Sequence, residues 1–172
     1  DNGDGTLKAE IEPAKSDAIV FENVYEATGT LTLDVTKTVN GASVTAARNG
    51  MFSFNLSGNG VDDTKTNDGD GVATFDAITF TQTDIGKSYT YTVKELPVAN
   101  AAYTADATEY IVIAEIADNG DGTLNVTKTV RKGTETVTDM AFDNAYRATG
   151  SMDLAALKTV NGVAAGAHNG SS

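Results

Sequence analysis

The stretch Leu31-Thr32-Leu33-Asp34-Val35-Thr36-Lys37-Thr38-Val39 alternates apolar and polar residues. Because side chains at i and i+2 of a strand share a face, this pattern predicts a β-strand with an apolar inner face. Further strand-like runs are Met51–Leu56, Val72–Phe80, Tyr89–Glu95, Tyr110–Ile116, Thr123–Val130 and Val137–Tyr146. Turn sequences separate them, at Asn40-Gly41, Asn49-Gly50, 67–71 and 119–122. With no convincing amphipathic helix, the sequence predicts an all-β sandwich of about seven strands.

Composition excludes several classes of function. The chain has 172 residues, of which 40% are hydrophobic, so it has enough apolar side chains for a folded core. It contains no apolar run long enough for a membrane helix. A net charge of −12 argues against binding nucleic acid. With no cysteine and only His168, disulfides, cysteine-ligated zinc and conventional hydrolase triads are not expected, and no cofactor is predicted.

Several motifs occur twice. The segment 1–7 (DNGDGTL) recurs at 118–124, 21–25 (FENVY) at 142–146 (FDNAY), and 37–41 (KTVNG) at 158–162. From residue 21 onward the offset is constant at 121 residues (142 − 21 and 158 − 37). We therefore predict a tandem repeat cut out of phase. Residues 1–25 would end one repeat, 26–146 form a complete one, and 147–172 begin the next.

Three polar residues fall on inner faces of the predicted strands. Lys37 lies on the face of Leu33 and Val35, Glu95 on that of Tyr91 and Val93, and Asn144 on that of Met140 and Phe142. In the partial repeats, Asn23 and Lys158 occupy equivalent positions. One interpretation is that Lys37 and Glu95 reach water at strand ends and form a marginal ion pair.

The other interpretation is chemical. Burial lowers the pKa of a lysine, which supplies a neutral amine, and raises that of a glutamate, which can then carry protons. An asparagine carboxamide is an acyl group with ammonia as its leaving group. Attack of Lys37 on Asn144, assisted by Glu95, would form an intramolecular isopeptide bond. It would do so once per molecule, so no enzymatic turnover is expected.

The sequence resembles the Gram-positive pilin isopeptide-linkage repeat, the immunoglobulin-like domain of streptococcal major pilins and related wall-anchored adhesins. The resemblance rests on the segments 35–41 (VTKTVNG), 52–56 (FSFNL), 89–95 (YTYTVKE), 110–112 (YIV) leading into 118–122 (DNGDG), and 142–146 (FDNAY). It implies an Ig-like (CnaB-type) sandwich with its first and last strands side by side. It also implies Lys37 as reactive lysine, Glu95 as catalytic acid and Asn144 as acceptor. The chain lacks a sorting signal and a pilin polymerisation motif, so an adhesin stalk fits as well as a pilus shaft.

Two functions are weighed. The favoured one is an extracellular stalk or fibre repeat at the bacterial cell surface, with neighbouring repeats as its partners. The alternative is an adhesive module that binds a host ligand, with calcium ordering its loops. The segments 67–71 and 118–122 do not match a calcium-binding loop, however, and turn chemistry accounts for both. Within one chain, Asn23 and Lys158 are expected to stay unreacted, because their repeats lack a counterpart of Tyr89–Glu95.

Overall fold

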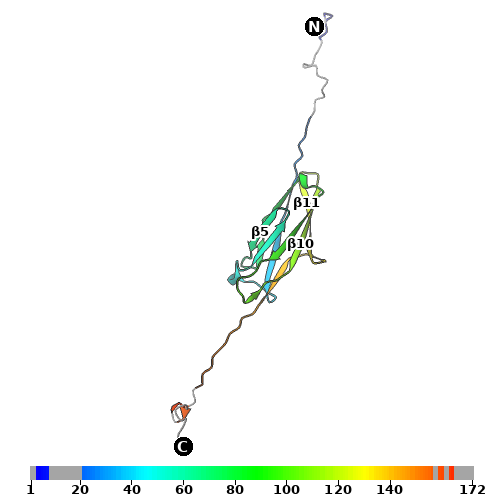
Figure 1. Ribbon diagram of the computed structural model, residues 1–172. Helices are drawn as coiled ribbons and strands as arrows, with labels where there is room; N and C mark the ends of the chain where they lie inside the picture. Colours follow the sequence, from blue (N-terminus) through cyan, green and yellow to red (C-terminus); the bar gives the residue numbers. More distant parts are fainter. Residues whose placement is uncertain (1–2, 8–20, 157–158, 161–162, 165–172) are drawn as a thin grey trace.

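A computed structural model describes residues 3–7, 21–156, 159–160 and 163–164. Residues 27–146 form an elongated β-sandwich, with the chain entering at one end and leaving at the other (Figure 1). The six-stranded sheet has the order β12 (Glu135–Val137), β11 (Leu124–Lys132), β10 (Glu109–Asp118), β8 (Ser88–Glu95), β4 (Ser53–Gly58) and β5 (Val61–Thr66). The five-stranded sheet has the order β3 (Ala42–Ser43), β2 (Asp34–Val39), β13 (Ala141–Tyr146) and β9 (Tyr103–Thr104), with β6 (Val72–Thr74) also paired to β2.

Smaller elements complete the described fold. β1 (Thr28–Leu31) and β7 (Ile78–Thr81) form a two-stranded ribbon, and β14 (Thr159–Val160) pairs with β15 (Val163–Ala164). The helical segments are two single 3₁₀ turns, η1 (Ala46–Arg48) and η2 (Gln82–Asp84). In the part of the chain that the structure describes, no helix has the length and apolar character to span a membrane.

The core lies between the two main sheets and follows the predicted alternation. In β2, Val35, Lys37 and Val39 are buried while the residues between them are not. The ring of Phe142 from β13 packs 5.2 Å from those of Phe54 in β4 and Tyr110 in β10. These contacts join one sheet to the other, so the all-β sandwich expected from sequence is confirmed.

The structure has more strands than the seven or so expected, because three long predicted runs are broken and because β3, β5 and β9 lie outside the predicted runs. The run Leu31–Val39 divides at Thr32-Leu33, where the chain stops pairing with β7 and begins to pair with β6 and β13. The run Val72–Phe80 divides beside this break, between β6 and β7. The amide of Phe75, just after β6, donates to the carbonyl of Leu33 (2.9 Å). The run Val137–Tyr146 divides between β12 and β13.

The first and last long strands lie side by side, as the resemblance implied. β2 and β13 run parallel, with Lys37 opposite Phe142 and Val39 opposite Asn144. Parallel neighbours require a long connection between them, and here almost the whole sandwich supplies it. The two ends of the domain are therefore joined in one sheet.

Candidate functional site

Three strands from both sheets bring the predicted residues together. Lys37 comes from β2, Glu95 from the end of β8 and Asn144 from β13. Their exposed fractions are 2%, 8% and 0%, so the inward orientation predicted by alternation is confirmed. The marginal interpretation, in which the lysine and glutamate reach water at strand ends, is wrong. Lys37 pairs with Phe142 of β13 and Glu95 with Phe54 of β4, and this strand pairing keeps both side chains between the sheets.

The Lys37 amine lies in a mostly apolar enclosure. Its Nζ donates to the carbonyl of Phe142 (3.0 Å) and lies 3.6 Å from Oε2 of Glu95. The ring of Phe52 is close by, with its centroid 5.0 Å from Nζ. Burial lowers the pKa of Lys37, and the nearby Glu95 carboxylate only partly offsets this effect. The enclosure thus favours the neutral, nucleophilic form of the amine more than water does.

Glu95 lies between the amine and the carboxamide. Its Oε2 faces Lys37, while its Oε1 accepts a hydrogen bond from Nδ2 of Asn144 (2.7 Å). Burial raises the pKa of Glu95, against the opposing effects of the Lys37 charge and the Asn144 hydrogen bond. A carboxyl group in this position can accept a proton from one nitrogen and deliver one to the other.

A backbone amide holds the carboxamide oxygen. The N–H of Asp106 donates to Oδ1 of Asn144 (2.8 Å) and also to Oε2 of Glu95 (3.0 Å). The Asp106 side chain fixes this loop by accepting from the amides of Thr108 and Asp143 (both 2.9 Å). Burial alone would raise the pKa of Asp106, but these hydrogen bonds outweigh it and the pKa is lowered. A donor at this oxygen would stabilise negative charge that develops there.

Asp106 was missed by the sequence analysis. It lies in the loop between β9 and β10, where no alternation indicates the direction of a side chain. Its contribution to the carboxamide is moreover made by a main-chain group, which every residue except proline carries. No sequence signal distinguished it.

Of the two equivalent positions in the flanking segments, Asn23 is described, and it is not part of this site. Asn23 is exposed, as are its neighbours Phe21 (87%) and Val24 (81%), whereas Phe142 and Asn144 are fully buried. Lys158 lies outside the described residues. The boundaries at residues 25/26 and 146/147 stay a prediction.

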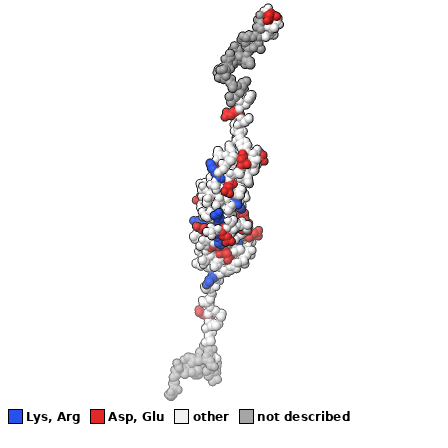
Figure 2. All heavy atoms as spheres, turned by 90° about the vertical axis from the view of Figure 1, so that its right-hand side faces the viewer, with Lys and Arg blue, Asp and Glu red and all other residues white. Residues whose placement is uncertain are grey.

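The aspartate-rich loops make turns through their own side chains. Asp118 Oδ1 accepts from the Gly120 amide and Asp121 Oδ1 from the Thr123 amide. Asp68 Oδ1 likewise accepts from the amides of Asp70 and Val72. Among the described residues, no three acidic or histidine side chains cluster as metal ligands. Acidic and basic side chains are interspersed on the face shown in Figure 2.

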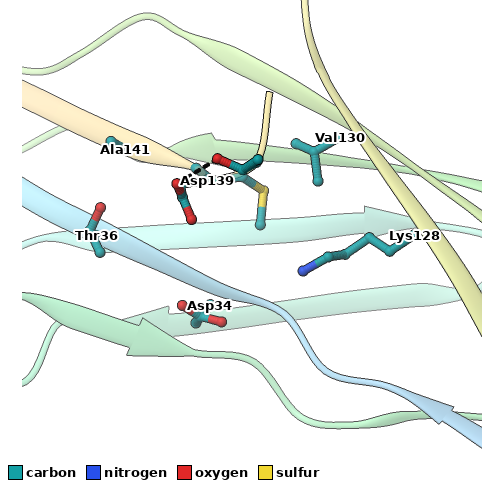
Figure 3. A pocket seen from close by; sticks show the side chains of 8 residues that line it. Asp34, Thr36, Lys128, Val130, Asp139 and Ala141 are labelled. Atoms are coloured by element: carbon teal, nitrogen blue, oxygen red, sulfur yellow. Dashed lines mark hydrogen bonds between the residues drawn. The ribbon is translucent and has the colours of Figure 1, made fainter. Parts of the chain in front are cut away.

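A surface groove of about 340 Å³ lies at an open edge between the sheets (Figure 3). Asp34 and Thr36 of β2 line one side, and Lys128 and Val130 of β11 the other. Asp139 is held by a hydrogen bond from the Thr138 hydroxyl (2.7 Å). The groove carries charges of both signs, and its lining does not include the three site residues.

Comparisons with known proteins identify the family of the chain. The model of the FctA family, described as a Spy0128-like isopeptide containing domain, matches residues 33–147. The chain belongs to this family. A search of curated proteins returned no match. Among solved structures, a single-residue mutant of the major pilin from Streptococcus pyogenes matches with a TM-score of 0.41 and 12% identity. That match covers 68% of this chain and 50% of the pilin chain, so the FctA-type domain spans about half of its length.

Proposed function

We propose that this chain is a structural repeat of a bacterial surface stalk or pilus, locked by an isopeptide bond between Lys37 and Asn144. The arrangement of Glu95 carries the proposal: one carboxylate oxygen faces the lysine amine and the other accepts from the asparagine amide. Nucleophile, proton carrier and acyl group thus share one water-poor space. Membership of an isopeptide-domain family supports the same conclusion.

The reaction needs no outside reagent. Glu95 takes a proton from the Lys37 ammonium, and the neutral Nζ attacks Cγ of Asn144. Negative charge develops on Oδ1, where the Asp106 amide donates. Glu95 then gives its proton to Nδ2 and receives one from Nζ. The Nζ–Cγ bond forms, the Cγ–Nδ2 bond breaks, ammonia leaves, and Glu95 ends protonated, which its raised pKa favours.

The bond would make the domain resistant to force. Tension along a stalk enters near β1 and β2 and leaves after β13, at opposite ends of the sandwich (Figure 1). A covalent link between the adjacent strands β2 and β13 would carry that force without loading the strands between them. In a chain without cysteine, an amide bond would do this independently of redox conditions. We infer an extracellular role at the cell surface, with neighbouring repeats as the immediate partners.

Intact-mass measurement tests the proposal. The parent chain should be lighter than its calculated mass by one ammonia, and Glu95→Ala should restore the full mass. Glu109→Ala, at an exposed glutamate on β10, is the matched control and should still lose ammonia. A full calculated mass in folded parent protein would refute the bond.

Peptide mapping locates the bond. Bonded Lys37 resists trypsin, so digestion should give one branched product joining residues 16–48 to residues 133–147. Loss of a second ammonia would bring Asn23 or Lys158 into the chemistry. A branched product at any other pair of residues would refute the assignment of the site.

A further inference from the structure

Two of the recurring motifs touch each other, although neither belongs to the buried site. The segment that enters the sandwich, Tyr25-Glu26-Ala27-Thr28-Gly29, has its counterpart in Tyr146-Arg147-Ala148-Thr149-Gly150. The loop that it meets, Asp118–Gly122, has its counterpart in residues 1–5. The contact lies at the end of the sandwich where the chain enters (Figure 1).

The contact begins at a tyrosine. The Tyr25 hydroxyl donates to Oδ1 of Asp118 (2.6 Å) and accepts from the amide of Gly122 (3.4 Å). The hydrogen bond raises the pKa of Tyr25 and lowers that of Asp118. Tyr25 is itself 45% exposed, so the contacts of its hydroxyl, and not burial of its ring, tie this segment to the loop.

The next residues close the contact. Ala27 is 1% exposed, and the Thr28 amide donates to the carbonyl of Gly122 (3.3 Å). At Gly29 the segment passes so near to β11 that a Cβ would lie 2.9 Å from both Cβ and the carbonyl oxygen of Leu124. The glycine of the repeated Ala-Thr-Gly is thus explained by this close approach to Leu124. At Gly150 an added Cβ meets nothing within 4 Å.

The loop that receives the segment has an internal side-chain turn. In the copy at residues 1–7, the Thr6 amide donates to Asp4 Oδ1 (3.0 Å), as the Thr123 amide donates to Asp121 Oδ1 (3.0 Å). Both copies of the loop are therefore held by the same side-chain turn.

We propose that the Tyr-x-Ala-Thr-Gly segment is a joint between repeats, which seats on the Asp118–Gly122 loop of the repeat that it enters. The partner of each loop is the last-strand tyrosine of the preceding repeat. Tyr146 would seat in the same way on the corresponding loop of a following copy, which this sequence does not include. A tandem array built this way is clamped at each junction and does not hinge freely.

Amide hydrogen exchange and ¹⁵N relaxation on the whole chain test the joint. Tyr25→Phe removes the hydroxyl, and with it both hydrogen bonds, but keeps the ring. It should speed exchange at the Thr28 amide at least about five-fold, which is the effect of losing one hydrogen bond. Relaxation at residues 22–26 should change toward that of residues 150–155. Tyr146→Phe is the matched control and should change neither. Unchanged exchange in Tyr25→Phe would overturn the proposal, as would parent relaxation at 22–26 equal to that at 150–155.

A second pair of variants tests the close approach. Gly29→Ala should loosen the joint, with faster exchange at Thr28, while Gly150→Ala should leave it unchanged. Equal exchange in both would overturn the assigned contact. Because the joint does not use Lys37, Glu95 or Asn144, the intact mass of Tyr25→Phe reports the isopeptide bond separately. Failure of either proposal can therefore be recognised on its own.

Discussion

The isopeptide bond should contribute a large part of the stability of the sandwich. A link between Lys37 and Asn144 closes a loop of about 107 residues (144 − 37). The chain-entropy relation for cross-links then gives about 5 kcal/mol, because the unfolded chain loses conformational freedom. With a urea m-value of about 2 kcal/mol/M, the midpoint should differ by about 2 to 3 M.

The perturbation must remove the bond without leaving a buried charge. Removing only the lysine would leave Glu95 as a buried charge without its partner, and this alone costs about 3–5 kcal/mol of stability. The double variant Lys37→Met, Glu95→Gln replaces both charged groups by neutral side chains of similar length. Urea unfolding of this variant and of the parent, followed by circular dichroism, measures the difference. Midpoints within about 0.5 M of each other, roughly 1 kcal/mol, would refute the reasoning.

Three further outcomes are expected. Asp106→Ala should slow bond formation and leave unreacted chain by mass, because the loop that presents the amide to Asn144 loses two anchoring acceptors; full reaction would contradict its role. In Asn144→Ala, which cannot form the bond, the urea midpoint should fall as pH rises above 4.5, because the raised pKa of Glu95 makes the folded state keep a proton that the unfolded state loses. The midpoint should rise again toward pH 10.5, because the lowered pKa of Lys37 makes the folded state lose its proton before the unfolded state does. A midpoint that does not change with pH would contradict both pKa shifts. Gly71→Ala should lower the melting temperature by an amount equivalent to at least about 1–2 kcal/mol, because its φ is +84° and a Cβ would lie 2.8 Å from the Lys37 carbonyl, whereas Gly69→Ala should change it little.

The inner faces were predictable from sequence, because alternation depends only on the strand itself. Lys37, Glu95 and Asn144 could be placed in the core before any pairing was known. The break at Thr32-Leu33 was not predictable, since it depends on which strands lie alongside. The strand β5 was missed although Asn59-Gly60 precedes it, with positive φ at both residues (48° and 83°). That pair is a standard signal for a two-residue hairpin.

The main-chain part of the site could not be predicted. The Asp106 amide reaches Asn144 only because its loop runs beside β13, held by Thr108 and Asp143. The repeated Gly29 carried a sequence signal, but its reason became visible only when β11 was placed against it. Both features depend on contacts between segments that are distant in the sequence, and the alternation of apolar and polar residues within a strand carries no information about such contacts.

The parallel pairing of β2 with β13 also has a consequence for the order of events in the life of the chain. During synthesis Lys37 precedes Asn144 by more than a hundred residues. The Lys37 amine therefore has no carboxamide beside it until β13, the final strand of the sandwich, has docked on β2. Strand pairings of such long range form slowly. A chain still unfolded, or one missing its last strand, keeps its amine and its carboxamide apart. The proposed covalent step would therefore take place only in a domain whose last strand has docked, and it would make that state irreversible only afterwards.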